Sequence, residues 1–174
     1  QQLLQANQEL EKQASQDGLT AIANRRQFDR CLQTELQRCA RNKLPLGLIL
    51  LDIDRFKLYN DHYGHQAGDD VLKQVAEMLH QQTKRGGELA ARYGGEEFAL
   101  ILPGSDIQAC EKLAIQIQQN LADLAIAHKT SDIAGHITAS LGLVSKIPDK
   151  QSKSSDLIQA ADKALYQAKA GGRN

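Results

Sequence analysis

Tryptophan is absent from the 174-residue sequence, and aromatic residues make up only 4% of it. A stacking platform for single-stranded nucleic acid needs aromatic rings, so little material exists to build one. Lysine plus arginine number 21, as do aspartate plus glutamate, and the formal net charge at pH 7 is zero. Without a positive excess, no long-range field attracts nucleic acid or an anionic membrane surface, so we expect neither as a partner.

Cysteines are few, and long apolar runs are missing. Cys31, Cys39 and Cys110 are too far apart for a Cys-x-x-Cys pair and cannot all pair within one chain, so we expect reduced, mostly buried thiols. The longest apolar run, Leu46 to Leu51, has strand length and falls short of the roughly 18–20 residues that span a bilayer. No charged-then-apolar leader follows Gln1, so we expect a cytoplasmic protein or the cytoplasmic end of a longer sensor or membrane protein.

The composition that is present, 41% hydrophobic and 24% charged residues, is typical of a folded globular chain. Residues 1–16 are rich in glutamine, glutamate and leucine without glycine or proline, which predicts a helical leader ahead of one α/β domain over residues 17–174. Four leader residues are spaced four, three and four apart: Leu3, Asn7, Leu10 and Ala14. Two heptads fit either a short coiled coil that dimerises the chain or an ordinary amphipathic helix.

Helical and strand patterns alternate along the domain. Apolar spacing predicts helices over 25–40, 69–82, 105–126 and from about Ser155 to Gly171-Gly172, with Asp69 as N-cap or first-turn residue and Ser155 as N-cap. Strands are predicted over 46–54, 88–93, 97–102 and 136–144. The first is apolar throughout and should be covered on both faces, whereas the last alternates and should bury one face. Gly94-Gly95 between the second and third strands indicates a hairpin.

Acidic residues gather at two strand ends. Asp52 and Asp54 close the first predicted strand, and Glu96-Glu97 follow the Gly94-Gly95 turn. Carboxylates are the ligands that Mg²⁺ prefers, and ligands of α/β sheets gather at the carboxyl ends of strands. We expect at most one of the two aspartates to share a site with the glutamates. Taken alone, each motif also fits a surface cap or a plain hairpin.

Together these segments resemble a known family. Arg92-Tyr93-Gly94-Gly95-Glu96-Glu97-Phe98 is similar to the active-site turn of the GGDEF family of diguanylate cyclases, in its GGEEF variant. Three further blocks follow the family's order: DGLTAIANRRQFD from Asp17, LDIDRFKLYNDHYGHQAGDDVL from Leu51 and ADKALYQAKAGGRN at the end. The resemblance implies a catalytic domain over residues 17–174. Its fold would be a central, mostly antiparallel sheet flanked by helices, like nucleotidyl cyclases and polymerase palm domains.

The resemblance also implies an activity. Each domain would bind one GTP, and two domains would face each other as a homodimer. Each 3′-hydroxyl would then attack the other α-phosphate to give cyclic di-GMP and two pyrophosphates. Asp52, Glu96 and Glu97 would be catalytic. With the carbonyl of Ile53 they would also bind Mg²⁺, or alternatively Mn²⁺. Glu97 is either a second metal ligand or the group that takes the 3′-hydroxyl proton.

Further positions match the family's substrate contacts. Asn60 and Asp69 would read guanine, whose N1–H and amino donors suit these acceptors. The phosphates would meet Lys57, Lys169 and Arg173, with backbone N–H groups of the turn through Phe56.

Two positions depart from the family. Ala21 replaces its usual glycine. Arg85-Gly86-Gly87-Glu88 stands where members with product feedback carry Arg-x-x-Asp, so Arg85 and Glu88 are candidates for a weakened cyclic di-GMP feedback site.

Two alternatives to an enzyme remain open at this point. The first is a non-catalytic module that binds GTP or cyclic di-GMP. The second, a purely structural dimerisation domain, leaves the acidic turn unexplained. Matching residue types at the metal, base and phosphate positions favour the enzyme.

Overall fold

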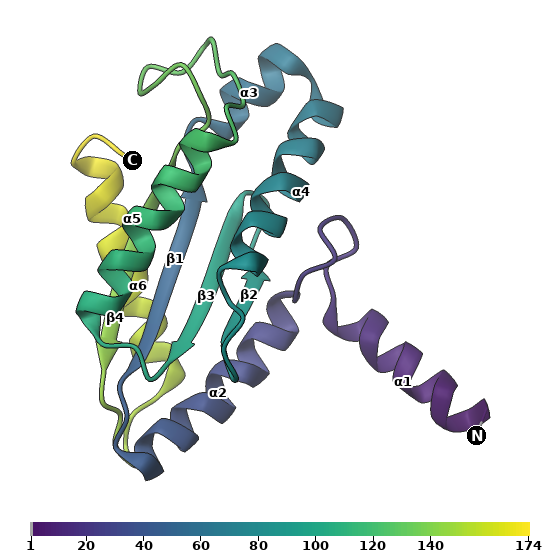
Figure 1. Ribbon diagram of the computed structural model, residues 1–174, viewed down its shortest axis with the longest axis vertical. Coiled ribbons are helices and arrows are strands. Elements are labelled where there is room, and N and C mark those ends of the chain that lie inside the picture. Colours follow the sequence, from purple (N-terminus) through teal and green to yellow (C-terminus); the bar gives the residue numbers. More distant parts are fainter. Residues whose placement is uncertain (1) are drawn as a thin grey trace.

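The computed structural model describes residues 2–174, except for the side chains of residues 7–9 and 11–13. Figure 1 shows its helices and strands, which include every predicted element and one further helix, α3. In chain order they are α1 (Gln2–Ser15), α2 (Arg25–Asn42), β1 (Leu46–Ile53), α3 (Phe56–Tyr63), α4 (His65–Gln81), β2 (Leu89–Arg92), β3 (Glu97–Pro103), α5 (Ile107–Asp123), β4 (Ala139–Lys146) and α6 (Ser154–Ala170).

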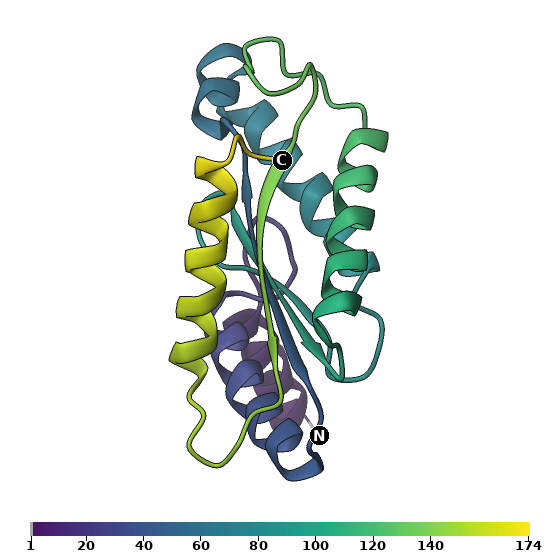
Figure 2. The ribbon, with the colours of Figure 1, turned by 90° about the vertical axis from the view of Figure 1, so that its left-hand side faces the viewer.

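The four strands form one sheet in the order β2-β3-β1-β4, and each neighbouring pair is antiparallel. This confirms the predicted antiparallel sheet. All eight residues of β1 are buried, as its continuous apolar sequence predicts for a central strand. One hydrophobic cluster packs α3, α4 and α5 against one face of the sheet, and a second packs α2 and α6 against the other. Figure 2 shows α5 and α6 on opposite sides of the strands.

Four predicted features are wrong in detail. Helix α3 was not predicted, and α4 begins at His65, so Asp69 lies in its second turn and is not a cap. Gly64, with a φ of +91°, separates the two helices, a conformation that favours glycine. Ser155 is not the N-cap of α6, because that position is Lys153. The helix predicted over 105–126 is shorter, because α5 spans Ile107–Asp123 and Asp106 caps it by accepting a hydrogen bond from the Ala109 N–H.

The last strand also departs from expectation. β4 begins at Ala139, and its first four residues are all buried, although one buried face was predicted. On the second face, the Ser140 hydroxyl donates to the buried carboxylate of Asp54 at 2.7 Å, and Gly142 packs against Ala161 and Leu165 of α6; Thr138, just before the strand, also donates to Asp54 at 2.8 Å.

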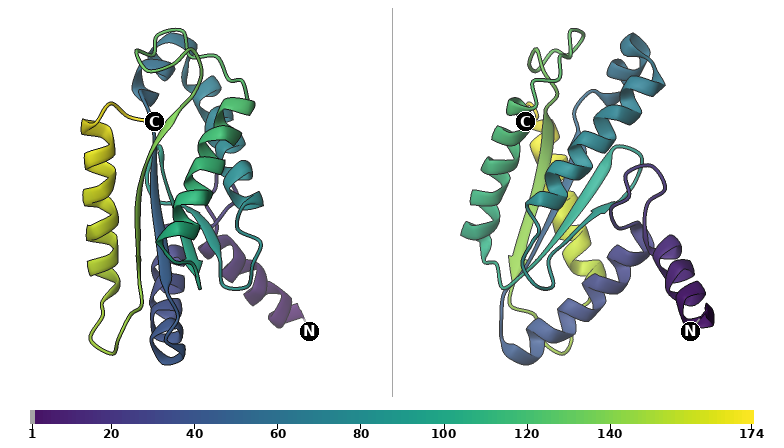
Figure 3. Two further views of the ribbon diagram at one scale, coloured as in Figure 1. Left: turned by 60° about the vertical axis from the view of Figure 1, so that its left-hand side comes forward. Right: turned by 45° about the vertical axis from the view of Figure 1, so that its right-hand side comes forward.

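The leader is helical as predicted and projects from the domain (Figure 3). Its leucines are exposed, with 81% of Leu3, 68% of Leu4 and 61% of Leu10 accessible. Gln1 and the side chain of Asn7, which belong to the predicted leader and its heptad pattern, lie outside the described residues. Coiled-coil pairing stays a prediction.

The three cysteines are free thiols, and Cys39 and Cys110 are buried, as predicted. Burial raises the pKa of Cys110 to about 11, so this thiol stays protonated at neutral pH. None of the described helices has the length and apolar character needed to cross a bilayer.

Candidate active site

The carboxyl end of β1 is where the predicted acidic residues meet. Antiparallel register places Asp52 opposite Glu97 of β3 and opposite Ser140 of β4. The backbone N–H of Ile53 donates to the Glu96 carbonyl at 3.2 Å, which fixes the Gly-Gly turn against the strand end. Asp54 does not join this group, because its carboxylate is held by Thr138 and Ser140. One of the two aspartates thus lies beside the glutamates, as expected.

The charges of this group are only partly compensated. Asp52 is 9% exposed, and its Oδ2 lies 3.0 Å from the Nζ of Lys169. Burial raises the pKa of Asp52 above its ordinary value, and the hydrogen bond and charge of Lys169 oppose that rise. Burial also raises the pKa of Glu97, and the neighbouring Asp52 carboxylate raises it further. An additional cation would relieve this repulsion.

The donor atoms here suit Mg²⁺, which binds carboxylate and carbonyl oxygens. Within residues 2–174, apart from the undescribed leader side chains, no three histidine, cysteine or acidic side chains are grouped closely enough to hold a metal ion by themselves. Mg²⁺ usually takes one or two protein carboxylates and completes its shell with water and substrate phosphates. The residues at this strand end therefore fit that ion together with a phosphate ligand.

A cavity of about 460 Å³ opens beside the acidic group. Helices α3 and α4 form one side and the Gly-Gly turn forms the other. Its lining residues are Phe56, Lys57, Asn60, Asp61, His65, Asp69, Leu72, Arg92, Gly95 and Glu96. Five of these were predicted as site residues: Phe56, Lys57, Asn60, Asp69 and Glu96. The volume lies in the usual range of small-molecule sites.

Asn60 and Gly68 define the helical side of this cavity. The Oδ1 of Asn60 is buried and receives no hydrogen bond from the described part of the chain. It lies against Gly68 of α4, where an added Cβ would come within 1.8 Å of it. Glycine is thus required for α3 and α4 to approach this closely. A buried acceptor without a donor is costly, which is typical of a position that a ligand completes.

The carboxyl end of α6 supplies the remaining predicted cations. Lys169 reaches the site through its ion pair with Asp52, and the charge of Arg173 also favours the ionised form of Asp52. The backbone N–H of Arg173 donates to the Ala168 carbonyl at 3.0 Å, which ties the chain end to α6. Lys57 is exposed at the first turn of α3.

A family model for the GGDEF domain of diguanylate cyclases matches residues 14–174. The chain belongs to the GGDEF domain family. It is 40% identical over 166 residues to the diguanylate cyclase VdcA of Vibrio cholerae, covering 95% of this chain and 47% of that protein. To the probable diguanylate cyclase DgcC of Escherichia coli K12 it is 31% identical over 172 residues, 99% of this chain and 45% of the relative. The chain spans about half the length of these relatives.

Solved structures agree with this membership and with the fold. The coiled coil and GGDEF domain of DgcB from Caulobacter crescentus, in complex with c-di-GMP, matches with a TM-score of 0.88 and 32% identity, over 99% of this chain and 89% of that one. The active GGEEF domain of a diguanylate cyclase from Vibrio cholerae gives a TM-score of 0.75 and 34% identity, over 87% and 94%.

Two predicted residues of this GGDEF domain lie elsewhere. Arg85 and Glu88 line a separate cavity of about 370 Å³ with residues of β3 and α5, including Lys112. The Glu88 carboxylate accepts a hydrogen bond from the Arg85 N–H at 3.0 Å, so it is turned onto its own loop.

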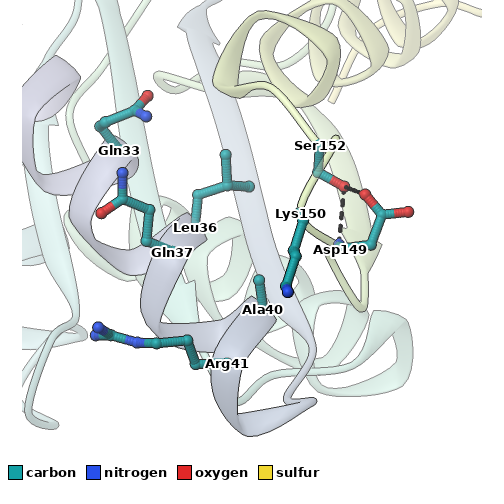
Figure 4. A pocket seen from close by; sticks show the side chains of 8 residues that line it. All are labelled: Gln33, Leu36, Gln37, Ala40, Arg41, Asp149, Lys150 and Ser152. Carbon is teal, nitrogen blue, oxygen red and sulfur yellow. Dashed lines mark hydrogen bonds between the residues drawn. The ribbon is translucent and has the colours of Figure 1, made fainter.

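Another cavity, of about 380 Å³, lies between α2 and the connection from β4 to α6 and contains none of the predicted site residues (Figure 4). Its lining includes Arg41, Asp149 and Lys150.

Arg92 lines the GGDEF cavity and was not predicted as a site residue. Its guanidinium donates to the Gly95 carbonyl at 2.8 and 3.1 Å and forms an ion pair with Asp17 at 3.2 Å. Burial works to raise the pKa of Asp17, but hydrogen bonds from Thr20 and Arg92 outweigh it and the pKa is lowered. Both residues belong to motifs that resemble the family, and this membership could have indicated that they are part of the site. Their pairing across 75 positions was not visible in the sequence.

Proposed function

We propose that this GGDEF domain is a diguanylate cyclase that condenses two GTP into cyclic di-GMP and two pyrophosphates between two facing protomers. The observation that carries the proposal is the cavity beside the end of β1. Asn60 and Asp69 line this cavity on its helical side, and Glu96 lines it on the Gly-Gly turn, so one nucleotide bound there would lie between them. Family membership and the names of the relatives support the same activity. A reaction that consumes GTP fits a cytoplasmic domain.

In the proposed reaction, the 3′-oxygen of one GTP forms a bond to the α-phosphorus of the other, and the bond to the β-phosphate oxygen breaks. Pyrophosphate leaves, and the hydroxyl proton passes to a base. Glu97 suits that role, because its raised pKa makes it a better proton acceptor near neutral pH. Repeating the step with the roles exchanged closes the ring.

Asp52, the Ile53 carbonyl, Glu96 and Glu97 would hold Mg²⁺ or Mn²⁺. When bound, the metal ion neutralises charge on the triphosphate and on the leaving pyrophosphate. Lys169 and Arg173 would add positive charge from α6. Their contacts with phosphate would replace the present ion pair between Lys169 and Asp52.

Guanine would be read by α3 and α4. The Asp69 carboxylate would accept from the N1–H and the amino group of guanine, and adenine offers an acceptor at N1 instead. Asn60 contributes a buried acceptor that has no protein donor in the described residues. The phosphates would meet Lys57 and the backbone N–H groups at the start of α3, beginning with Phe56. A site built on such hydrogen bonds rejects the wrong base strongly.

The product has two-fold symmetry, which calls for two protomers related by a two-fold axis. Helix α1 would hold them together through the heptad positions that include Leu3 and Leu10, which this structure leaves exposed. A coiled coil over this leader would bury these leucines.

We also propose that cyclic di-GMP binds weakly at the cavity of Arg85 and Glu88. Glutamate keeps the carboxylate that the family's aspartate provides, but its extra methylene adds rotamer freedom that binding must restrict. Feedback inhibition should be weaker than in Arg-x-x-Asp members. Inhibition by added product should be lost in Arg85→Ala and kept in Lys73→Ala, an exposed α4 control. An inhibition constant unchanged by Arg85→Ala would rule the site out.

The test of the activity is incubation with GTP and Mg²⁺, with chromatography for cyclic di-GMP and pyrophosphate. Sedimentation at the same protein concentrations would establish whether dimers are present. Product from the dimer supports the proposal. A dimer that binds GTP without forming product would contradict it and favour a non-catalytic module.

A further inference from the structure

The connection between α5 and β4 packs over α3 and over the turn that leads into it. Figures 1 and 2 show this segment, residues 124–138, beside α3 at one end of the domain. Two of its contacts bind the flank of α3: the Lys129 N–H donates to the Tyr63 hydroxyl at 3.1 Å, and the Thr130 hydroxyl donates to the Leu58 carbonyl at 3.5 Å. Other contacts reach the turn itself, which consists of Asp54 and Arg55.

The turn has an unfavourable backbone conformation. Arg55 is the N-cap of α3 and has φ +54° and ψ +32°, the left-handed region, and no side-chain hydrogen bond caps the helix. A residue with a Cβ pays a conformational cost there, so the surrounding structure must hold it in place. The next residues, Phe56 and Lys57, begin the helix whose N–H groups are proposed to meet phosphate. The conformation of Arg55 therefore sets the direction of those groups.

His128 holds the backbone of this turn. It is 1% exposed, and its Nε2 lies 3.1 Å from the Arg55 carbonyl oxygen. A carbonyl can only accept, so Nε2 carries the proton and donates. The Thr130 hydroxyl lies 3.5 Å from Nδ1, and the imidazole packs edge-to-face on Tyr59 with ring centres 5.3 Å apart. The Arg55 carbonyl thus fixes a proton on Nε2, and the packing on Tyr59 fixes the orientation of the ring.

Asp132 holds the side chain of the same residue. The Nε and Nη2 of Arg55 donate to the two carboxylate oxygens of Asp132, each at 2.8 Å. Bidentate pairs of this kind restrict geometry as well as adding energy. The Arg55 hydrogen bond also lowers the pKa of Asp132. Main chain and side chain of Arg55 are thus both bound by one segment that lies outside the cavity.

We infer that His128 and Asp132 are positioning residues for nucleotide binding: they hold the β1–α3 turn so that the first N–H groups of α3 face the triphosphate. The inference rests on the proposed function, because it assigns the phosphates to this turn. Neither residue lines the cavity, and neither would touch the substrate.

The experiment compares four variants of the chain. His128→Leu removes the donor to Arg55, and His128→Gln restores an N–H at nearly the same place. Asp132→Ala removes the ion pair from a residue whose side chain is 63% exposed, so this variant should fold even where His128→Leu does not. His80→Leu, at an exposed histidine in the last turn of α4, is the matched control.

Two readouts separate positioning from general destabilisation. The first is amide hydrogen exchange over residues 54–60 without nucleotide, compared with residues 65–81. The second is the ratio of affinities for a non-hydrolysable GTP analogue with Mg²⁺ and for guanosine, which lacks phosphates. We expect His128→Leu and Asp132→Ala to speed exchange in the first segment only and to lower the affinity ratio at least about fivefold. His128→Gln should recover most of the ratio, and His80→Leu should change neither quantity.

The outcomes are distinguishable. Unchanged hydrogen exchange over residues 54–60 in both His128→Leu and Asp132→Ala would overturn the inference, whatever the ratio of nucleotide affinities. Faster exchange with an unchanged affinity ratio would show that the turn is held but does not serve phosphate binding, which also overturns it. A wild-type chain that binds no GTP analogue would instead refute the proposed function, and the positioning role with it.

Discussion

The two ends of the candidate active site differ in how their polar groups are satisfied. At the acidic end, the Asp52 carboxylate forms an ion pair with Lys169 and repels the Glu97 carboxylate, and the pKa values of both acids are raised. At the helical end, Asn60 carries a buried acceptor without a protein donor in the described residues, pressed against Gly68. At the acidic end, the ion pair of Asp52 can be exchanged for contacts with a metal ion. At the helical end, the packing is already formed, and only a hydrogen-bond donor to Asn60 is missing.

This difference indicates that the two ends of the site have different functions. A preformed set of hydrogen-bonding groups discriminates between ligands, because a ligand with the wrong donors leaves it unpaired. The charged side chains at the acidic end can exchange their ion pair for contacts with a metal ion and phosphates. They then act on the reacting atoms. We therefore expect substitutions at the acidic end to affect turnover and those at the helical end to affect selectivity and affinity.

The largest effect should follow from neutralising the acidic end. Asp52→Asn or Glu97→Gln should lower kcat for cyclic di-GMP formation by about 1,000-fold or more, because a metal ligand or the proton acceptor is lost. Initial rates by chromatography measure it, with Glu111→Gln on the exposed face of α5 as control. If both variants kept a tenth of the activity, Asp52 and Glu97 would not be catalytic residues.

Base selectivity should respond next, at the helical end. In Asp69→Asn the amide presents a donor and a weaker acceptor to guanine, so the preference for GTP over ATP in kcat/KM should fall about 100-fold. Asp70→Asn changes the neighbouring, exposed carboxylate and should leave the preference intact. An equal preference in the two variants would show that Asp69 does not read the base.

A smaller effect should come from the packing of the helical end. The Cβ of Gly68→Ala would displace the Asn60 amide, so GTP affinity should fall about tenfold and stability by about 1–3 kcal/mol. Gly18→Ala, where an added Cβ meets nothing within 4 Å, is the matched control. Calorimetric titration and denaturant unfolding give the two values. Normal affinity in Gly68→Ala would mean that the close approach of α3 and α4 is unimportant for binding.

The smallest effect has opposite signs for two ligands. Lys169→Met frees the Asp52 carboxylate, so Mn²⁺ should bind about fivefold more tightly without nucleotide, whereas GTP should bind more weakly. Titration calorimetry measures both, and Lys163→Met on exposed α6 surface should change neither. If Mn²⁺ affinity fell, the ion pair would not compete with the metal ion.

The sequence predicts the parts of this molecule that depend on local patterns. The buried run of β1, the Gly-Gly hairpin and the long amphipathic helices follow from apolar spacing, and the motifs indicate which residues belong to the site. The short helix α3 was missed because eight residues carry too little periodicity. Asp69 looked like a cap because the start of α4 depends on the backbone of Gly64, which spacing does not reveal.

Other features depend on contacts between distant segments. Arg92 binds Asp17, and Arg55 binds Asp132, across 75 and 77 positions. The fit of Asn60 against Gly68 depends on how closely two helices approach. No single stretch of sequence carries such information, so these partners become visible only in the folded chain.

The central place of β1 has a consequence for where the chain tolerates change in length. Because β3 and β4 both run antiparallel to β1, adding one residue to either neighbour would shift Glu97 or Ser140 away from Asp52. At the other end of the domain, the connection of Asp149 to Ser152 is an exposed turn held by its own hydrogen bonds (Figure 4). A reporter peptide or fluorescent domain inserted there lengthens a surface loop at little entropic cost and leaves the acidic strand end in register.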